Sequence, residues 1–385
     1  MKKSLVALAT MSVVSSAFAD IDISGGVKMY GTLDQGAVTQ NLQSADTNIT
    51  SNYSGMFAAN ATSRLGFKGA RDLGDGFKGI FQAEIQLDPD TATLLPTKNR
   101  TAFVGLQGAF GSIMGGTMET AAYEVFGMDV NGRIEYKPQV WRTTTSLDLQ
   151  DRANNSIKYI SPEFGGFTLH FQQSFNEIAD TTSVVAATAN TYAQLTSYSI
   201  KYQKDKLRAA FVHDETKNAL MGYKFAGLSN AGPSTTGTTS YNLYYGTPTT
   251  LTNGTVQRDI ASVSYNFDSF SVNYLFAKSY QTGTYAASNT TSTFGVKVPF
   301  DKLTLALSYG TGTVDSAYTS TTAVIGSTGG LGRATDGSLS DTTVGIYYNF
   351  DKSTSAYFLG SQSTSSVGLY DGSNKTFAMG ARYNF

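Results

Sequence analysis

Apolar and polar residues alternate along most of the chain, in segments of roughly ten residues that end at turn residues. Near the C-terminus, Phe377, Met379 and Tyr383 occupy one parity, while Arg382 and Asn384 occupy the other. Side chains of a β-strand point alternately to its two faces. Each segment is therefore predicted to be a strand with one apolar and one polar face.

Turn residues divide this pattern into sixteen predicted strands. Their ranges are 21–34, 56–70, 76–88, 99–108, 111–118, 152–161, 166–176, 194–203, 206–214, 258–267, 270–280, 291–300, 302–313, 341–350, 353–362 and 376–385. Residues 218–226 and 240–246 also resemble strands, but we assign them to one long external loop at 215–257. A hairpin there would instead give eighteen strands.

The connections between the predicted strands alternate between short turns and long loops. Short turns include 73–76, 162–166 and 301–302. The long connections are rich in Thr, Ser, Gly and Asn and occupy 35–55, 119–151, 177–193, 215–257 and 310–340. This asymmetry is typical of outer-membrane barrels.

The residues on the two faces also favour a membrane barrel over a water-soluble sandwich. The sequence Tyr-Asn-Phe ends three predicted strands, at 265–267, 348–350 and 383–385, as an aromatic girdle requires. The polar faces carry Lys, Arg, Asn, Gln and Ser, which would be costly to bury in a sandwich core. A closed barrel of sixteen strands accommodates them in a water-filled bore.

Composition excludes several other classes of protein. The 385 residues include no Cys, and their formal net charge is −1, so a disulfide scaffold is excluded and a basic nucleic-acid binder is disfavoured. His170 and His213 are the only histidines, and neither lies near a nucleophile motif. We therefore expect no enzymatic activity, no cofactor and no metal.

The N-terminus has the pattern of a secretory signal peptide. Lys2 and Lys3 precede the apolar stretch 5–14, and Ala17-Phe18-Ala19 gives a small-x-small cleavage site. We predict a signal peptide at 1–19 and a mature barrel at 20–385.

Three segments resemble the general porins of Gram-negative bacteria, particularly the betaproteobacterial type. They are SRLGFKGARDLGDG at 63–76, FVGLQGAFGSIMGG at 103–116 and ANNSIKYISPEFGGF at 153–167, and the terminal Phe385 fits the same resemblance. It implies a transmembrane antiparallel β-barrel of sixteen strands, exported to the outer membrane as a homotrimer among its lipids. It also implies a third external loop, here about 119–151, folded inward to narrow a channel for inorganic ions and small hydrophilic solutes.

Parity places a group of charged side chains on the inner face of the predicted barrel. They are Arg64, Lys68, Glu84, Arg100, Arg152 and Lys158. For Arg100, this orientation assumes that Thr101 and Phe103 face outward.

The predicted constriction loop contributes acids to the same zone. Glu124 and Asp129 belong to a set of six acids against three bases within 119–151. By resemblance, Arg64, Arg100 and Arg152 line one side of the narrow zone, with Glu84 and Glu124 near them. Each arginine could instead form a structural pair with a neighbouring carboxylate.

Charges on opposite sides of a narrow pore sort ions by sign. Because the wall residues are mostly basic, we expect passive diffusion with a modest anion preference. The alternatives are a substrate-specific channel, or a barrel that acts mainly as an adhesin or structural protein.

Overall fold

The computed structural model describes residues 21–44, 50–57, 61–89, 99–131, 152–175, 194–221, 252–282, 287–316, 337–366 and 372–385. The predicted signal peptide at 1–19 lies outside these ranges. Among the described residues, no helix has the length and apolar character needed to cross a membrane.

The described chain consists of strands and one short helix. The strands of the first half are β1 (Ile21–Ser24), β2 (Val27–Ser44), β3 (Thr50–Phe57), β4 (Arg64–Gly74), β5 (Phe77–Gln86), β6 (Asn99–Gly108), β7 (Gly111–Glu119), β8 (Arg152–Ile160) and β9 (Phe167–Ser174). Those of the second half are β10 (Gln194–Lys204), β11 (Leu207–Met221), β12 (Thr252–Asn266), β13 (Ser271–Gln281), β14 (Ala287–Phe300), β15 (Leu303–Ser316), β16 (Gly337–Asn349), β17 (Thr354–Ser365) and β18 (Gly372–Asn384). The helix α1 spans Ala121–Phe126 and follows β7.

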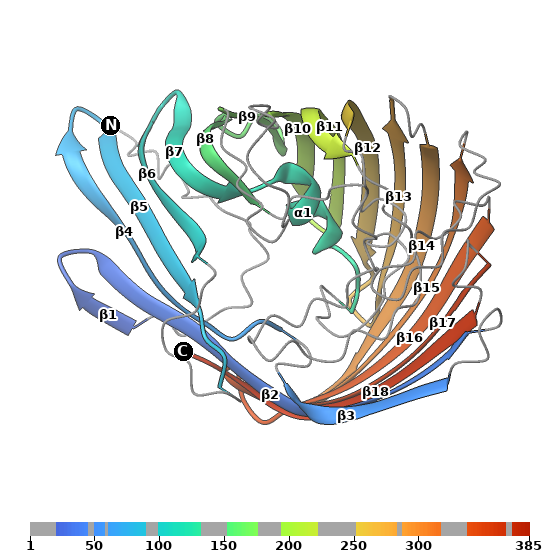
Figure 1. Ribbon diagram of the computed structural model, residues 1–385. Coiled ribbons are helices and arrows are strands. Elements are labelled where there is room, and N and C mark those ends of the chain that lie inside the picture. The colour runs from blue at the N-terminus through green and yellow to red at the C-terminus, as the bar shows by residue number, and fades with distance from the viewer. Residues whose placement is uncertain are drawn as a thin grey trace.

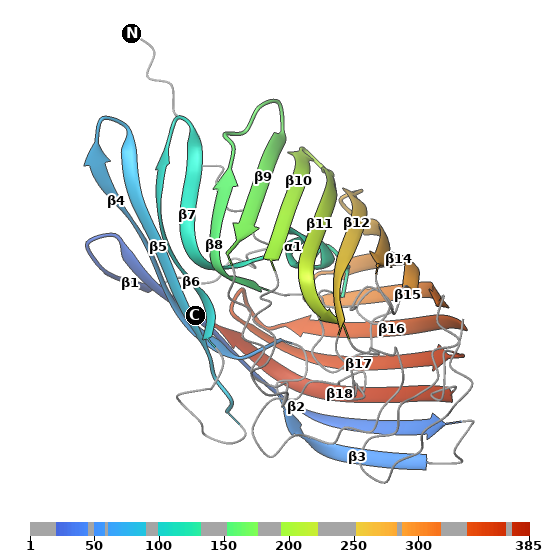
Figure 2. The same ribbon diagram turned by 45° about the horizontal axis from the view of Figure 1, so that its top comes forward.

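The strands form a closed antiparallel ring, which Figures 1 and 2 show from two directions. From β4 to β18 each strand pairs with the next, and β18 pairs with β2 from Thr32↔Asn384 to Ser44↔Gly372. Both β3 and β4 pair with β2, at 36–43 and 27–32 respectively, and so share one position in the ring. The positions are β2, the β3–β4 pair and β5 to β18, which makes sixteen. The prediction of an all-β barrel of sixteen antiparallel strands is confirmed.

Several predicted boundaries need correction. The first predicted strand, 21–34, is divided at Gly25 and Gly26, whose φ angles of 60° and 82° turn the short β1 back onto β2. On the side of the long connections the strands extend into predicted loops, as in β2, which continues to Ser44. In residues 35–41 of β2 the only apolar side chains, Ala37 and Val38, are adjacent, so hydrogen bonding continues where the alternation of apolar and polar residues has ended.

The prediction that 215–257 is entirely a loop is also wrong at both ends. β11 runs to Met221 and β12 begins at Thr252, and the two strands pair directly with each other. The ring therefore closes here without a further hairpin. Residues 222–251, including most of the two strand-like stretches, lie outside the described part of the chain.

Burial separates the outer and inner faces of the ring. On β16, Val344 and Tyr348 are exposed on the outer face, whereas Asp341 and Thr343 are buried on the inner face. Most of the other strands whose side chains the structure describes follow the same division, with large apolar side chains exposed and many Ser, Thr, Asn and charged residues buried. This division explains how a chain with a mean hydropathy of −0.17 can form a membrane barrel.

The helix α1 lies inside the ring (Figure 1). Thr120 caps its N-terminus, because Thr120 Oγ1 accepts a hydrogen bond of 3.2 Å from the Tyr123 N–H. One apolar cluster joins the helix to the inner faces of β11, β12 and β13. Its members are Ala121, Ala122, Val125, Phe126, Ala210, Val212, Ile260, Leu275 and Ala277.

Candidate functional site

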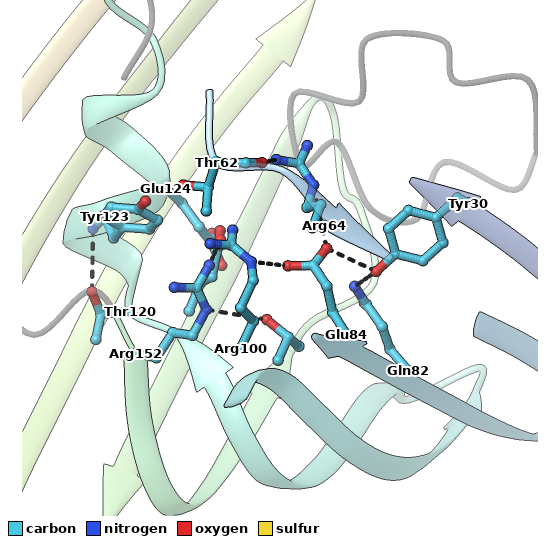
Figure 3. A network of polar contacts seen from close by, with 12 residues as sticks. Tyr30, Thr62, Arg64, Gln82, Glu84, Arg100, Thr120, Tyr123, Glu124 and Arg152 are labelled. Carbon is cyan, nitrogen blue, oxygen red and sulfur yellow. Dashed lines mark hydrogen bonds and ion pairs between the residues drawn. The ribbon is translucent and has the colours of Figure 1, made fainter. Parts of the chain in front are cut away.

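The inner wall from β4 to β8 carries an arginine cluster, which comprises Arg64, Glu84, Arg100, Glu119 and Arg152. Each strand from β4 to β8 contributes one of these side chains. Figure 3 shows that the three guanidinium groups point toward the same region of the interior. The antiparallel register of neighbouring strands therefore brings charges from five parts of the sequence together.

Glu84 is the centre of the contacts in the cluster. Its Oε1 accepts a hydrogen bond from Arg100 Nε, and Arg64 Nε lies 3.4 Å from its Oε2. The Tyr30 hydroxyl donates to the same Oε2 at 3.0 Å and accepts from Gln82 Nε2 at 2.6 Å. Two bases and a hydroxyl thus hold one buried carboxylate in a fixed orientation (Figure 3).

Arg152 is positioned by a second carboxylate and by helix α1. Its Nη2 donates to Glu119 Oε1 at 2.8 Å, and its Nε donates to Thr101 Oγ1 at 3.4 Å. The guanidinium carbon lies 5.5 Å from the centre of the Tyr123 ring, within the range of a cation–π contact. Arg152 therefore links the wall to helix α1.

Arg100 faces inward as predicted, but the assumption about its neighbours is wrong. Thr101 and Phe103 are buried on the inner side, whereas Val104 is 69% exposed on the outer side. The register of β5 and β6 shifts between Ala83↔Ala102 and Ile85↔Asn99, so Arg100 and Thr101 together oppose Glu84. This β-bulge breaks the parity and turns both residues inward.

A second group of charges, the lysine clamp, comprises Glu124, Lys158 and Lys201. Glu124 lies on α1, and its two carboxylate oxygens accept hydrogen bonds from Lys158 Nζ and Lys201 Nζ, on β8 and β10. Lys158 Nζ also donates to the backbone carbonyl of Glu119 at 3.0 Å. Burial opposes ionisation of Glu124, but the two lysines outweigh it and hold the pKa of this carboxyl well below its usual range. His170 Nδ1 lies 4.0 Å from Glu124 Oε2.

Two other predicted site residues have different surroundings. The ammonium group of Lys68 lies 4.9 Å from the centre of the Tyr30 ring, next to the arginine cluster. Asp129 lies beyond α1, and its Oδ1 accepts a hydrogen bond of 2.8 Å from the Asn131 N–H. The structure therefore brings seven of the eight predicted residues into adjoining groups, while Asp129 shapes a local turn. Residues 132–151 of the predicted constriction loop lie outside the described chain.

The sequence interpretation missed three side chains that hold these groups together, namely Tyr30, Gln82 and Lys201. Parity could have found Lys201, which lies between the outward-facing Ile200 and the aromatic Tyr202 on β10. Parity also places Tyr30 on the polar face of the first predicted strand with Lys28 and Asp34, but the sequence does not show that its hydroxyl contacts Glu84.

The two groups together carry more positive than negative charge. Their bases are Arg64, Arg100, Arg152, Lys158 and Lys201, and their acids are Glu84, Glu119 and Glu124. Every one of these acids is within ion-pair distance of at least one of the bases. Five bases against three acids leave a formal surplus of two positive charges. In the described residues, no group of three His, Asp or Glu side chains could hold a metal ion.

Related sequences share parts of this chain. It is 31% identical over 174 residues to the major outer membrane protein P.IB of Neisseria lactamica, a match that covers 44% of this chain and 48% of that protein. It is 29% identical over 230 residues to outer membrane porin protein 32 of Delftia acidovorans, covering 58% of this chain and 62% of that protein. The chain thus spans about half the length of the Neisseria relative that it matches.

Solved structures share the fold over nearly the whole chain. An anion-selective porin from Comamonas acidovorans superposes with a TM-score of 0.68 at 18% identity, covering 93% of this chain and 99% of that one. A loop-deletion mutant of OmpT, an outer membrane protein of Vibrio cholerae, superposes with a TM-score of 0.66 at 15% identity, covering 94% and 100%. The family model described as Gram-negative porin matches residues 4–368. Fold, wall chemistry and family match agree, and the chain belongs to the Gram-negative porin family.

Proposed function

We propose that the protein is an outer-membrane channel through which ions and small hydrophilic solutes diffuse passively, with a modest preference for anions. The observation that carries the proposal is a closed ring with an apolar outer face and an inner face of buried polar and charged residues. A closed ring leaves no unpaired strand edge in lipid, and sixteen strands enclose an aqueous bore. The chain reaches the outer membrane after removal of residues 1–19.

The segment 119–151 narrows this bore. In support, α1 lies on the inner wall of β11 to β13, and the lysine clamp ties it to β8 and β10. The arginine cluster faces the interior beside it. The narrow zone is therefore lined by Arg64, Arg100 and Arg152 with Glu84, Glu119 and Glu124.

The anion preference follows from the charges of that zone. Each carboxylate of the two groups contacts a base, so the acids are largely neutralised and the surplus of basic side chains attracts anions. Guanidinium groups stay charged at any relevant pH, so this potential is lasting. The structural relative from Comamonas acidovorans is described as anion-selective, which agrees with the proposal.

The reversal potential in an asymmetric KCl gradient tests the selectivity. We expect the wild type to favour chloride and Arg64→Ala to move the reversal potential toward that of a non-selective pore. Lys375→Ala is the matched control, because it removes a positive charge from the exposed outer face of β18. An unchanged potential in Arg64→Ala, or an equal shift in Lys375→Ala, would remove Arg64 from the selectivity filter.

The protein also acts as a homotrimer, and we place the contact on the outer face of β2 and β4 to β7. Tyrosine belongs at the lipid–water boundary of membrane barrels. The exposed tyrosines of the described residues are Tyr198, Tyr265, Tyr274, Tyr280, Tyr309, Tyr348 and Tyr383, which all lie on β10 to β18. The face of β2 and β4 to β7 instead exposes Leu33, Phe67, Val104, Leu106 and Ile113. An apolar face without a tyrosine belt fits contact with a second copy better than contact with the lipid boundary.

A further inference from the structure

The segment after α1 does not end at the lysine clamp but continues to the opposite part of the inner wall. Val130 N–H donates a hydrogen bond of 3.1 Å to Asn273 Oδ1 on β13. Asn131 Nδ2 donates to Ser308 Oγ on β15 at 3.0 Å, and Asn131 Oδ1 accepts from the Tyr347 hydroxyl on β16 at 3.3 Å. Both ends of the Asn131 amide are therefore bonded to the wall.

The wall under Val130 and Asn131 contains two glycines whose missing side chains make room for them. A Cβ at Gly295 would lie 2.5 Å from Val130 Cγ2 and 2.4 Å from Asn273 Oδ1. A Cβ at Gly345 would lie 2.6 Å from Asn131 Oδ1. Distances below 3.0 Å are essentially never seen at real Cβ atoms, so a larger residue at either position would force the neighbouring side chains, among them those of Val130 and Asn131, to shift.

The strand register places these residues side by side. Asn273 pairs with Gly295, and Gly295 pairs with Ser308, so three adjacent strands present them in one row. Gly345 pairs with Ala306, two residues from Ser308 on the same face of β15. Two glycines thus lie among the polar residues of the wall, next to the side chains of Val130 and Asn131.

We infer that Asn273, Gly295, Ser308, Gly345 and Tyr347 form a tip seat that holds residues 130–131 against the wall and thereby sets the free cross-section of the channel. The inference rests on the proposed channel function. Glu124 and Asn131 are the two ends of one short span, tied to β8 and β10 at one end and to β13, β15 and β16 at the other. Because this segment is bonded to the wall at both ends, its position in the bore is fixed. The tip seat residues therefore position the segment and do not contact the solute.

Substitution of the glycines tests the seat through conductance. We expect Gly295→Ala and Gly345→Ala to push the tip into the bore and to lower the single-channel conductance, while circular dichroism still reports a folded barrel. Gly360→Ala is the matched control on β17, because a Cβ there meets only side-chain atoms of Phe358 and Phe377, at 3.7 Å or more. A wild-type conductance in both seat variants, or an equal loss in Gly360→Ala, would overturn the inference.

Formation of a disulfide tests the position of residue 131 directly, and it remains informative if the two alanine variants fail to fold. The chain has no Cys, so the double variant Asn131→Cys with Gly345→Cys contains the only pair of thiols. We expect an oxidant to join them, as detected by gel mobility and mass spectrometry, and the locked channel to conduct as the reduced one does. Asn131→Cys with Gly360→Cys is the control, because Gly360 packs against Phe358 and Phe377 on the outer face.

The two results separate the seat from the proposed function. Failure of the disulfide to form, or a locked channel with a conductance different from the reduced one, would overturn the seat. A folded wild-type protein that forms the disulfide in the double variant but never conducts would contradict the channel function and leave the position of the tip established.

Discussion

At the scale of single residues, buried carboxylates organise the interior, because each one forms ion pairs with basic side chains. Glu84 accepts from Arg100 and Tyr30 and faces Arg64, and Glu124 binds two lysines. Removing one partner from such a group leaves a buried charge uncompensated, which is strongly destabilising. The same pairing that fixes the geometry also leaves a formal surplus of positive charge on the wall, so under the proposed function the same side chains carry both structural and selective roles.

The pKa of Glu124 leads to a prediction about pH. Because the two lysines hold this pKa well below its usual range, ionisation of Glu124 stabilises the docked α1 above the unfolded value of about 4.3, and the gain is lost as pH falls through the lower folded value. We therefore expect the single-channel conductance to stay constant from about pH 8 to about pH 5. Measurement in Glu124→Gln should show a less steady current at every pH. A conductance step between about pH 5 and 7 that persists in His170→Gln would contradict this assignment.

At the scale of elements, much of the barrel could be predicted from the sequence because the lipid imposes a period of two on every strand. The pattern fails where that constraint ends. The extensions of β2 to Ser44 and of β11 to Met221 form strands without a sustained alternation of apolar and polar residues, and the β-bulge opposite Glu84 changes the parity of Arg100 and its neighbours. The side chains of the arginine cluster could be assigned to the interior, but their individual partners depend on the register.

The alternating strand pattern does not predict helix α1, but the sequences of two strands that it packs against indicate that something covers them. Ala209 to Val212 on β11 and Tyr274 to Ala277 on β13 are apolar on both faces. In a water-filled bore, inward-facing side chains such as Val212 and Leu275 would be exposed to water at a cost in free energy. Such stretches therefore indicate that another segment of the chain covers them. The structure places α1 there.

The apolar cluster under α1 gives a prediction at this scale. Phe126 is fully buried against the wall, so Phe126→Ala should weaken docking of the helix by about 3–5 kcal/mol. We expect larger open-channel current fluctuations and faster proteolysis between β7 and β8 while the barrel stays folded. Phe294→Ala is the matched control, since Phe294 is 50% exposed on the outer face of β14. Equal noise and equal proteolysis in the two variants would show that this cluster does not hold α1.

At the scale of the whole molecule, the two ends of the chain close the barrel. β18 and β2 pair over thirteen positions, from 372 to 384 and from 44 to 32. Asp34 is fully buried at this seam and accepts hydrogen bonds from the Tyr357 hydroxyl at 2.7 Å and from Arg382 Nε at 3.1 Å. Because the first long strand, β2, pairs with the last strand, β18, closure of the barrel depends on contacts between residues that are far apart in the sequence. Proteins dominated by such contacts typically fold slowly.

The distribution of exposed tyrosines leads to a prediction about assembly. Val104→Arg lies on the tyrosine-free face and should shift the protein from trimer to monomer, as measured by light scattering in detergent. Val263→Arg, on the tyrosine-bearing face, introduces the same charge at another exposed valine and should leave the trimer intact. If Val104→Arg remains trimeric, or if Val263→Arg is the variant that dissociates, the contact lies elsewhere.

Stepwise current through the purified protein in a planar lipid bilayer tests the central claim most directly. The account predicts discrete conductance steps, a current proportional to small applied voltages, and a conductance that rises in proportion to KCl concentration, as a water-filled bore requires. A protein that is folded by circular dichroism and inserted in the bilayer, but produces no conductance steps, would contradict the account.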